Sequence, residues 1–123
     1  MAIKSTQRLM VAIAIAIVSL PRSAAAQAPP SDGKALYLKN CRQCHGAVGV
    51  PSATNKAKYP KIRDLTDATF MATLSVDSLV HVIRHGKGKD MRPFEGKLKD
   101  AEILAIAQYV RTLPASKAAR TED

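Results

Sequence analysis

Both cysteines of this sequence lie in one short motif, Cys41-Arg42-Gln43-Cys44-His45. The pattern Cys-x-x-Cys-His is typical of covalent attachment of a c-type haem. Two cysteines three positions apart on one helical turn can each form a thioether with a haem vinyl group. The adjacent histidine can then give a neutral imidazole nitrogen to the iron. The motif therefore predicts one haem c, covalent through Cys41 and Cys44, with His45 as proximal ligand.

Three other interpretations of the cysteine pair are a structural disulfide, a thioredoxin-like redox pair and half of a zinc site. A zinc site lacks a second Cys pair or a Cys/His partner, because the chain has only two cysteines. A redox pair would need a βαβ context, whereas the flanking residues here predict helix. A disulfide gives His45 no role, so haem attachment is the favoured interpretation.

A haem iron with one histidine ligand needs a second ligand or keeps an open position. Beyond residue 45 the candidates are Met71, His81, His85 and Met91. The two histidines are expected on the polar face of a helix, and Met71 follows Phe70 in an apolar patch, where methionine usually fills a core. Met91 lies in a polar loop that offers it no burial, so it is predicted to be the distal ligand.

His/Met ligation raises the reduction potential relative to bis-His ligation and leaves no axial position open. The sequence shows no paired carboxylates, no nucleophile with an adjacent base and no second metal cluster. We therefore expect one-electron transfer rather than enzymatic catalysis.

Residues 1–26 are predicted to form a cleaved secretory signal peptide. Lys4 and Arg8 precede the apolar run Leu9–Leu20, and small residues follow at Ala24–Ala26, in the order of a secretory signal. As a helix the run spans about 18 Å, short of the roughly 30 Å bilayer core, which disfavours a membrane anchor. We expect cleavage after Ala26, export to the periplasm and no stable membrane span in the mature chain.

The rest of the chain predicts helices joined by long loops. One helix, capped by Ser31 or Asp32, leads into the motif, and a second begins after Ser75 and ends at Gly86. A last helix begins at Asp100 and is expected to end at Pro114. Its predicted buried face is Ile103, Ile106, Val110 and Leu113, flanked by Tyr109.

Residues 46–66 contain several glycines and prolines and predict a long loop that wraps one edge of the haem. Within it, Pro51 or Pro60 is expected to present a backbone carbonyl to the free ring N–H of His45, with Pro60 preferred. Asp67–Ala72 predicts a short helical turn, and residues 86–96 predict the loop that carries Met91.

Taken together, these segments resemble the class I cytochrome c family, of the small bacterial periplasmic kind. The resemblance covers roughly Asp32 to Leu113. It rests on five segments: Asp32–Tyr37, Cys41-x-x-Cys44-His45, Val82–Gly88, Met91-Arg92-Pro93-Phe94 and Ile106–Leu113.

The resemblance implies a close glycine–aromatic crossing of the N- and C-terminal helices, with Gly33 and Tyr37 against Ile106 and Tyr109. Lys99 departs from the family, which commonly has a Ser or Thr cap there, and Asp100 is expected to take over that cap. Arg92 is a second departure, a charge directly after the ligand.

The predicted fold is all-α: a small class I cytochrome c-like bundle of three or more helices wrapped around one haem, with long loops. Its predicted parts are signal peptide 1–26, cytochrome c domain 27–114 and disordered tail 115–123. The expected function is a periplasmic one-electron carrier between redox proteins. The alternatives are a subunit held permanently in a dehydrogenase or oxidase complex and, with an open iron, a catalytic or gas-sensing haem protein.

The chain is basic, with 19 Lys and Arg against 10 Asp and Glu. Nucleic acid is not expected as the partner of an exported protein. A ring of charges around the exposed haem edge is expected to steer the protein to an acidic patch on a redox partner, whether it acts as a monomer or in a complex. The predicted ring is Arg42, Lys87, Lys89, Arg92, Lys97 and Lys99.

Overall fold

The computed structural model describes residues 32–121, and in this part of the chain it is entirely helical, without a strand. The all-α prediction is confirmed. The expected signal peptide and its cleavage site lie outside the described residues. Within residues 32–121 no helix is long and apolar enough to cross a membrane. The helices are α1 (Gly33–Asn40), α2 (Arg42–His45), α3 (Ala53–Lys58), α4 (Ala68–Ala72), α5 (Val76–His85) and α6 (Asp100–Thr121).

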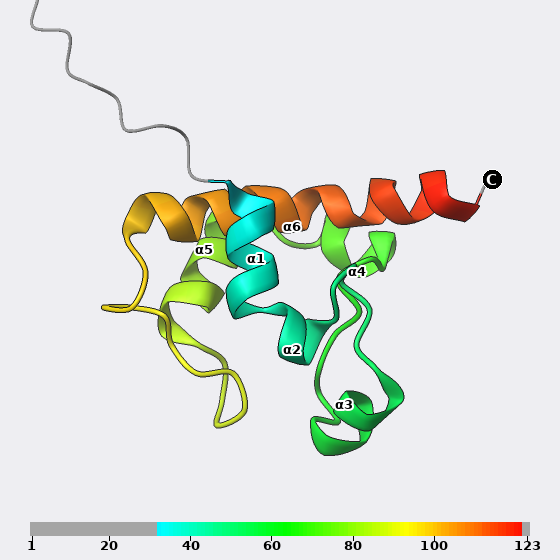
Figure 1. The fold of residues 1–123 in the computed structure, drawn as a ribbon, viewed down its shortest axis with the longest axis horizontal. Helices are drawn as coiled ribbons and strands as arrows, with labels where there is room; N and C mark the ends of the chain where they lie inside the picture. The colour runs from blue at the N-terminus through cyan, green and yellow to red at the C-terminus, as the bar shows by residue number, and fades with distance from the viewer. Residues whose placement is uncertain (1–31, 122–123) are drawn as a thin grey trace, which may run out of the picture.

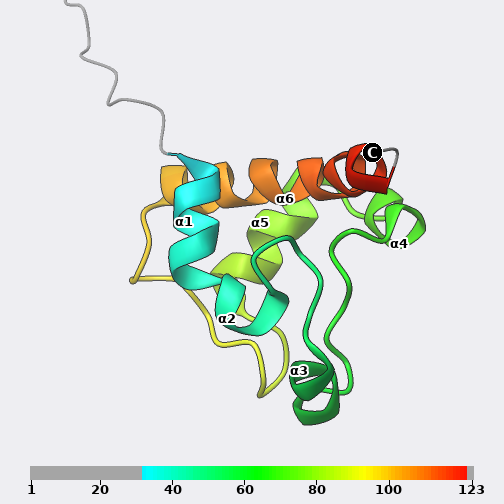
Figure 2. The same ribbon diagram turned by 45° about the vertical axis from the view of Figure 1, so that its right-hand side comes forward.

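The long helix α6 is the platform of the fold. Helices α1, α4 and α5 pack against it, and α2, α3 and the loop after α5 lie on the side away from it (Figures 1 and 2). The predicted buried face of α6 is confirmed, because all four of its apolar residues are at most 4% exposed. The core that forms there contains Tyr37, Met71, Leu79, Ile83, Ile103, Ile106, Ala107, Val110 and Leu113.

The crossing of α1 and α6 depends on Gly33. A Cβ atom at this position would lie 2.8 Å from the carbonyl carbon of Ala105 and closer still to its oxygen. One helical turn further along α1, the rings of Tyr37 and Tyr109 pack with centroids 5.3 Å apart. The implied glycine–aromatic contact is confirmed, with Ala105 as the backbone that approaches most closely.

Side-chain caps begin most of the helices. The Asp32 side chain accepts hydrogen bonds from backbone N–H groups at the start of α1. The Ser75 side chain does the same at the start of α5. Both caps are as predicted. The start of α6 differs from the expectation. Glu102 accepts from the backbone N–H of Lys99 at 2.7 Å, while the Asp100 carboxylate pairs with Arg84 at 3.0 Å.

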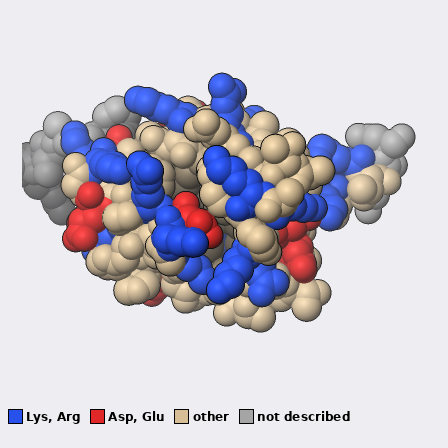
Figure 3. Space-filling model, turned by 90° about the horizontal axis from the view of Figure 1, so that it is seen from below, with Lys and Arg blue, Asp and Glu red and all other residues tan. Residues whose placement is uncertain are grey.

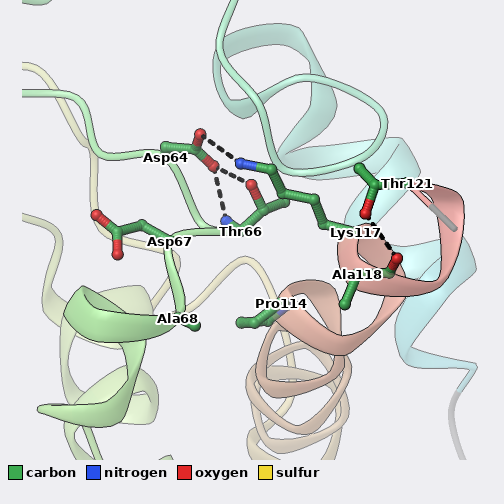
Figure 4. A pocket seen from close by; sticks show the side chains of 8 residues that line it. All are labelled: Asp64, Thr66, Asp67, Ala68, Pro114, Lys117, Ala118 and Thr121. Atoms are coloured by element: carbon green, nitrogen blue, oxygen red, sulfur yellow. Dashed lines mark hydrogen bonds and ion pairs between the residues drawn. The ribbon is translucent and has the colours of Figure 1, made fainter.

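Two predicted boundaries are wrong. Helix α6 continues through Pro114 to Thr121, so residues 115–121 do not form the expected disordered tail. Proline removes one backbone donor, but the following segment is rich in alanine, a strong helix former. In addition, Lys117 lies 3.9 Å from the Asp64 carboxylate, which ties the helix end to the loop before α4 (Figure 4).

The second wrong boundary concerns the loop 46–66, which contains α3. Ser52 accepts from the backbone N–H of Asn55 at 3.1 Å and thereby starts this short helix. Serine and asparagine favour loops and helix caps alike, so the sequence pattern alone did not separate the two.

Candidate functional site

The haem-attachment motif forms one tight helical turn. Cys41 ends α1 and caps α2, and its carbonyl accepts from the backbone N–H of His45 at 3.0 Å. Gly46, with φ +80°, ends α2 directly after the histidine. The turn therefore presents two thiols and one imidazole within five residues, as predicted.

Both cysteines are free and half-buried. Burial, followed by the nearby Cys44, raises the pKa of the Cys41 thiol to about 11. A redox-active cysteine needs the opposite, a pKa lowered toward neutrality. Within the described residues no group of three or more His, Cys, Asp or Glu side chains is placed to hold a metal ion. Geometry and electrostatics thus favour neither the redox pair nor the zinc site.

His45 is poised as a neutral ligand. Burial lowers the pKa of its imidazole, and the backbone of Arg63 opposes this in part. The backbone beside the ring is therefore that of Arg63, three residues beyond the expected Pro60. The Nδ1 atom of His45 is buried and has no hydrogen-bond partner among the described residues.

Neighbouring groups hold this turn in place. The Tyr37 hydroxyl donates to the Gly46 carbonyl at 2.7 Å. The Asn55 side-chain amide donates to the carbonyls of Gln43 and Cys44 at 2.7 and 3.0 Å, which links α3 to the motif. The sequence analysis missed the roles of Asn55 and Arg63. No local sequence pattern indicates these roles, because each joins two segments that are distant in the sequence.

Met91 lies in a loop that is pinned to the end of α5. Its carbonyl accepts from the Lys87 N–H at 2.9 Å, which forms an isolated antiparallel bridge. The residues after it are held as well, since Phe94 N–H donates to Ile83 O at 3.1 Å. The Met91 side chain is half-buried and packs against the core.

Gly86 allows this loop to pack so closely. It has φ +74°, and a Cβ atom there would lie 2.8 Å from Pro93 N and closer still to the Met91 carbonyl oxygen. Left-handed backbone conformations and close backbone approaches both favour glycine. The position of Met91 therefore depends on a glycine at residue 86.

The other sequence candidates for the distal ligand lie elsewhere. Met71 is 1% exposed within the core, as predicted. His81 and His85 are exposed on α5, also as predicted. Of the four candidates, Met91 alone lies in the loop that follows α5, and this loop lies on the same side of α6 as α2 (Figures 1 and 2).

A hollow of about 460 Å³ is lined by Pro60–Arg63 and by Lys87, which precedes Met91 in the same loop; none of Cys41, Cys44, His45 and Met91 lines it. A second hollow, of about 440 Å³, lies by Asp64, Pro114 and Lys117 (Figure 4), and no residue of the motif or of the Met91 loop lines it. The residues present fit a haem by their chemistry: two free thiols, an imidazole whose pKa burial lowers, and a thioether.

The face that bears these segments is strongly basic (Figure 3). All six residues of the predicted ring are exposed. The structure adds a second exposed set from α3 and the loop that follows it, which the sequence analysis did not single out: Lys56, Lys58, Lys61 and Arg63. We call the ten residues together the basic surface.

Comparisons with known proteins give the family of this chain. Residues 28–110 match the family model "Cytochrome C oxidase, cbb3-type, subunit III". The chain is 31% identical over 100 residues to cytochrome c6 of Thermosynechococcus vestitus, covering 80% of this chain and 83% of that protein. It is 36% identical over 94 residues to cytochrome c6 of Synechocystis, covering 76% and 72%.

Two further relatives complete the comparison. The cbb3-type cytochrome c oxidase subunit FixP of Bradyrhizobium diazoefficiens is 29% identical over 85 residues, which cover 69% of this chain and only 28% of that subunit. The solved structure of the KustC0563 c-type cytochrome is 33% identical and superposes with a TM-score of 0.61, covering 67% of this chain and 96% of that one. This chain therefore belongs to the c-type cytochrome family whose model is subunit III of cbb3-type cytochrome c oxidase, and it is a relative of the cytochromes c6.

Proposed function

We propose that this electron-transport protein holds one haem c through Cys41 and Cys44, with His45 and Met91 as axial ligands, and exchanges single electrons with redox proteins. The observation that carries the proposal is the state of His45. Its imidazole is kept neutral by burial and lies one residue from a free thiol. A neutral ring nitrogen is the form that binds iron.

The chain's own residues would tune this centre. When bound, the haem supplies a one-electron iron couple. The Arg63 backbone lies beside the imidazole of His45 and raises its pKa, which increases its basicity as a ligand. The thioether of Met91 would favour the reduced state and raise the reduction potential. With His45 and Met91 both bound to it, the iron would offer no site to a substrate, which supports electron transfer as the proposed function.

Covalent attachment is tested by acid denaturation followed by extraction with organic solvent. The haem of the wild-type protein should stay with the polypeptide. A Cys41→Ser/Cys44→Ser double variant, loaded with haem, is the control and should release it to the solvent. Release from the wild-type protein as well would refute the thioether bonds.

We further propose that the basic surface docks an acidic patch on the redox partner. Its charges are exposed, so salt screens them beyond about 10 Å at 0.1 M. The bimolecular electron-transfer rate should therefore fall steeply as salt is added. Lys87→Glu with Lys89→Glu should slow association and leave the visible spectrum unchanged. Lys34→Glu with Lys39→Glu, two exposed lysines of α1 outside the basic surface, is the matched control. A rate that responds neither to salt nor to the double reversal would indicate apolar docking.

A permanent subunit of an oxidase complex is the second candidate function, because the family model and FixP carry that description. Gel filtration of native extracts separates the candidates. Elution of the protein alone supports a mobile carrier, and co-elution with an oxidase or dehydrogenase supports the subunit.

Export to the periplasm, with cleavage after Ala26, completes the proposal. It rests on the basic, apolar and small-residue segments at the start of the sequence. The mass of the protein isolated from the producing cell tests it. A chain that begins at Gln27 supports export, and one that retains Met1–Leu20 would instead indicate a membrane-anchored cytochrome.

A further inference from the structure

Helix α5 carries two histidines that the haem site does not use. The sequence has three histidines, and His45 belongs to the attachment motif. His81 and His85 are four residues apart, so they lie on the same face of the helix. Both are exposed, and their rings are 4.6 Å apart between centroids with an interplanar angle of 55°. The structure thus brings two imidazoles together at the surface.

This spacing is suited to binding one metal ion. Two histidines at positions i and i+4 of a helix can coordinate the same ion from one face. Metal–nitrogen bonds of about 2.0–2.1 Å place two ligating nitrogens roughly 3 Å apart around the ion. Rings with centroids 4.6 Å apart reach that separation by side-chain rotation alone. Neither exposed ring has to leave a buried contact to do so.

The Glu95 carboxylate lies beside the second imidazole. Its Oε2 lies 3.6 Å from Nδ1 of His85. The Glu95 backbone is fixed beside the end of α5, because its N–H donates to the Arg84 carbonyl at 3.0 Å. A carboxylate next to one ring nitrogen favours the proton on that nitrogen, which leaves Nε2 free to bind a metal. Asp77, one turn before His81, adds a further exposed carboxylate to the same face.

We propose that His81 and His85 form a surface chelate for a borderline divalent transition-metal ion, with Glu95 as a positioning residue. Two protein nitrogens provide the binding, and water completes the coordination. The order of affinity should follow Cu²⁺ above Ni²⁺, and Cu²⁺ above Zn²⁺. The chelate goes beyond electron transport and does not depend on which residue is the distal haem ligand.

Metal binding has a structural consequence for the Met91 loop. His81 and His85 bracket the last turn of α5, whose carbonyls at Ile83 and Arg84 accept from the loop residues Phe94 and Glu95. An ion that binds the folded turn more tightly than the unfolded chain stabilises the fold in proportion to its concentration. The chelate therefore clamps the helix end that carries this loop.

Isothermal titration calorimetry of the oxidised haem-loaded protein tests the proposal. Separate titrations use CuCl₂, NiCl₂ and ZnCl₂ in a buffer that does not bind metals. We expect one ion per chain and a monomeric mass. His81→Gln or His85→Gln should weaken Cu²⁺ binding about tenfold or more, a loss of about 1.4 kcal/mol. The double variant should lose Cu²⁺ binding at this face, because neither imidazole remains there.

A rescue variant provides the matched control. Asp77→His together with His85→Gln restores a pair of histidines four residues apart, one turn earlier on α5. It should recover most of the lost Cu²⁺ affinity and show coupling to two nitrogens in the copper electron paramagnetic resonance spectrum. Glu95→Gln should weaken binding by up to about tenfold, while the metal-free urea midpoint stays unchanged.

Three results would overturn the chelate. The first is wild-type affinity in the protein that lacks both histidines. The second is one ion per two chains with a doubled mass, which would mean that the ion bridges two molecules. The third is Zn²⁺ binding more tightly than Cu²⁺.

Discussion

Substitution of Gly86 tests how the fold holds its proposed distal ligand. In Gly86→Ala the new methyl group would lie 2.8 Å from Pro93 N, 3.0 Å from the Arg92 carbonyl carbon and closer still to the Met91 carbonyl oxygen. These neighbours are backbone atoms, so no side-chain rotation relieves the contact. The φ of +74° adds strain for any residue with a Cβ atom.

The free-energy cost of Gly86→Ala follows from these contacts. At φ +74° and ψ −176° the backbone of Gly86 lies in a region essentially restricted to glycine, which costs about 1–3 kcal/mol with a Cβ atom, and overpacking costs about 1–3 kcal/mol more. Opposing this are four backbone hydrogen bonds that hold the loop, from the N–H groups of Lys87, Met91, Phe94 and Glu95. At about 0.5–1.5 kcal/mol each, they sum to a stabilisation of similar size. We therefore expect the loop to detach in Gly86→Ala and to carry Met91 away with it.

The assay is urea titration of the oxidised haem protein, followed through the iron–sulfur charge-transfer band. Gly88→Ala is the matched control, because Gly88 has a similar φ of +61° but a methyl group added there would have nothing within 4 Å. Gly88→Ala should therefore show only the backbone cost of about 1–2 kcal/mol. Gly86→Ala should lose the band at clearly lower urea or lack it from the start. Equal midpoints for the two variants would refute the packing role of Gly86.

Two further predictions concern the fold around the site. Gly33→Ala should lower the free energy of unfolding by about 1–3 kcal/mol, because its methyl group collides with the backbone of Ala105; an unchanged urea midpoint would contradict the close helix crossing. Tyr37→Phe should cost about 0.5–1.5 kcal/mol at neutral pH, since it removes the hydrogen bond to Gly46. Burial raises the pKa of Tyr37, so the folded phenol stays protonated while unfolded tyrosine ionises near pH 10. The stability advantage over Phe should hold below about pH 10 and shrink as the pH rises above it, and a gap that widens there would contradict this.

The sequence predicted those parts of the fold that depend on local chemistry. Ser75 and Gly86 bound α5 as their capping preferences indicate, and the 3.6-residue period identified the buried face of α6. Met91 differs from the expectation in one respect: its loop was expected to offer no burial, yet its side chain packs partly against the core. Its role as distal ligand stays a prediction.

The errors concern positions where tertiary contacts decide the outcome. Pro114 was expected to end α6, but the helix continues, and Lys117 contacts Asp64 beyond it. Asp100 was expected to cap α6, yet its carboxylate forms an ion pair with Arg84 of α5. The backbone beside His45 is that of Arg63, three residues beyond the expected Pro60. Each of these depends on a partner far away in the sequence, which composition and spacing do not specify.

The visible spectrum of the oxidised haem protein tests His45/Met91 ligation most directly. The wild-type spectrum should contain the iron–sulfur charge-transfer band. Met91→Leu should abolish that band and lower the reduction potential. Met71→Leu, a volume-conserving change in the core, should retain both. A band that survives in Met91→Leu, or disappears in Met71→Leu, would contradict the proposed ligand and with it the assignment of the loop to the haem.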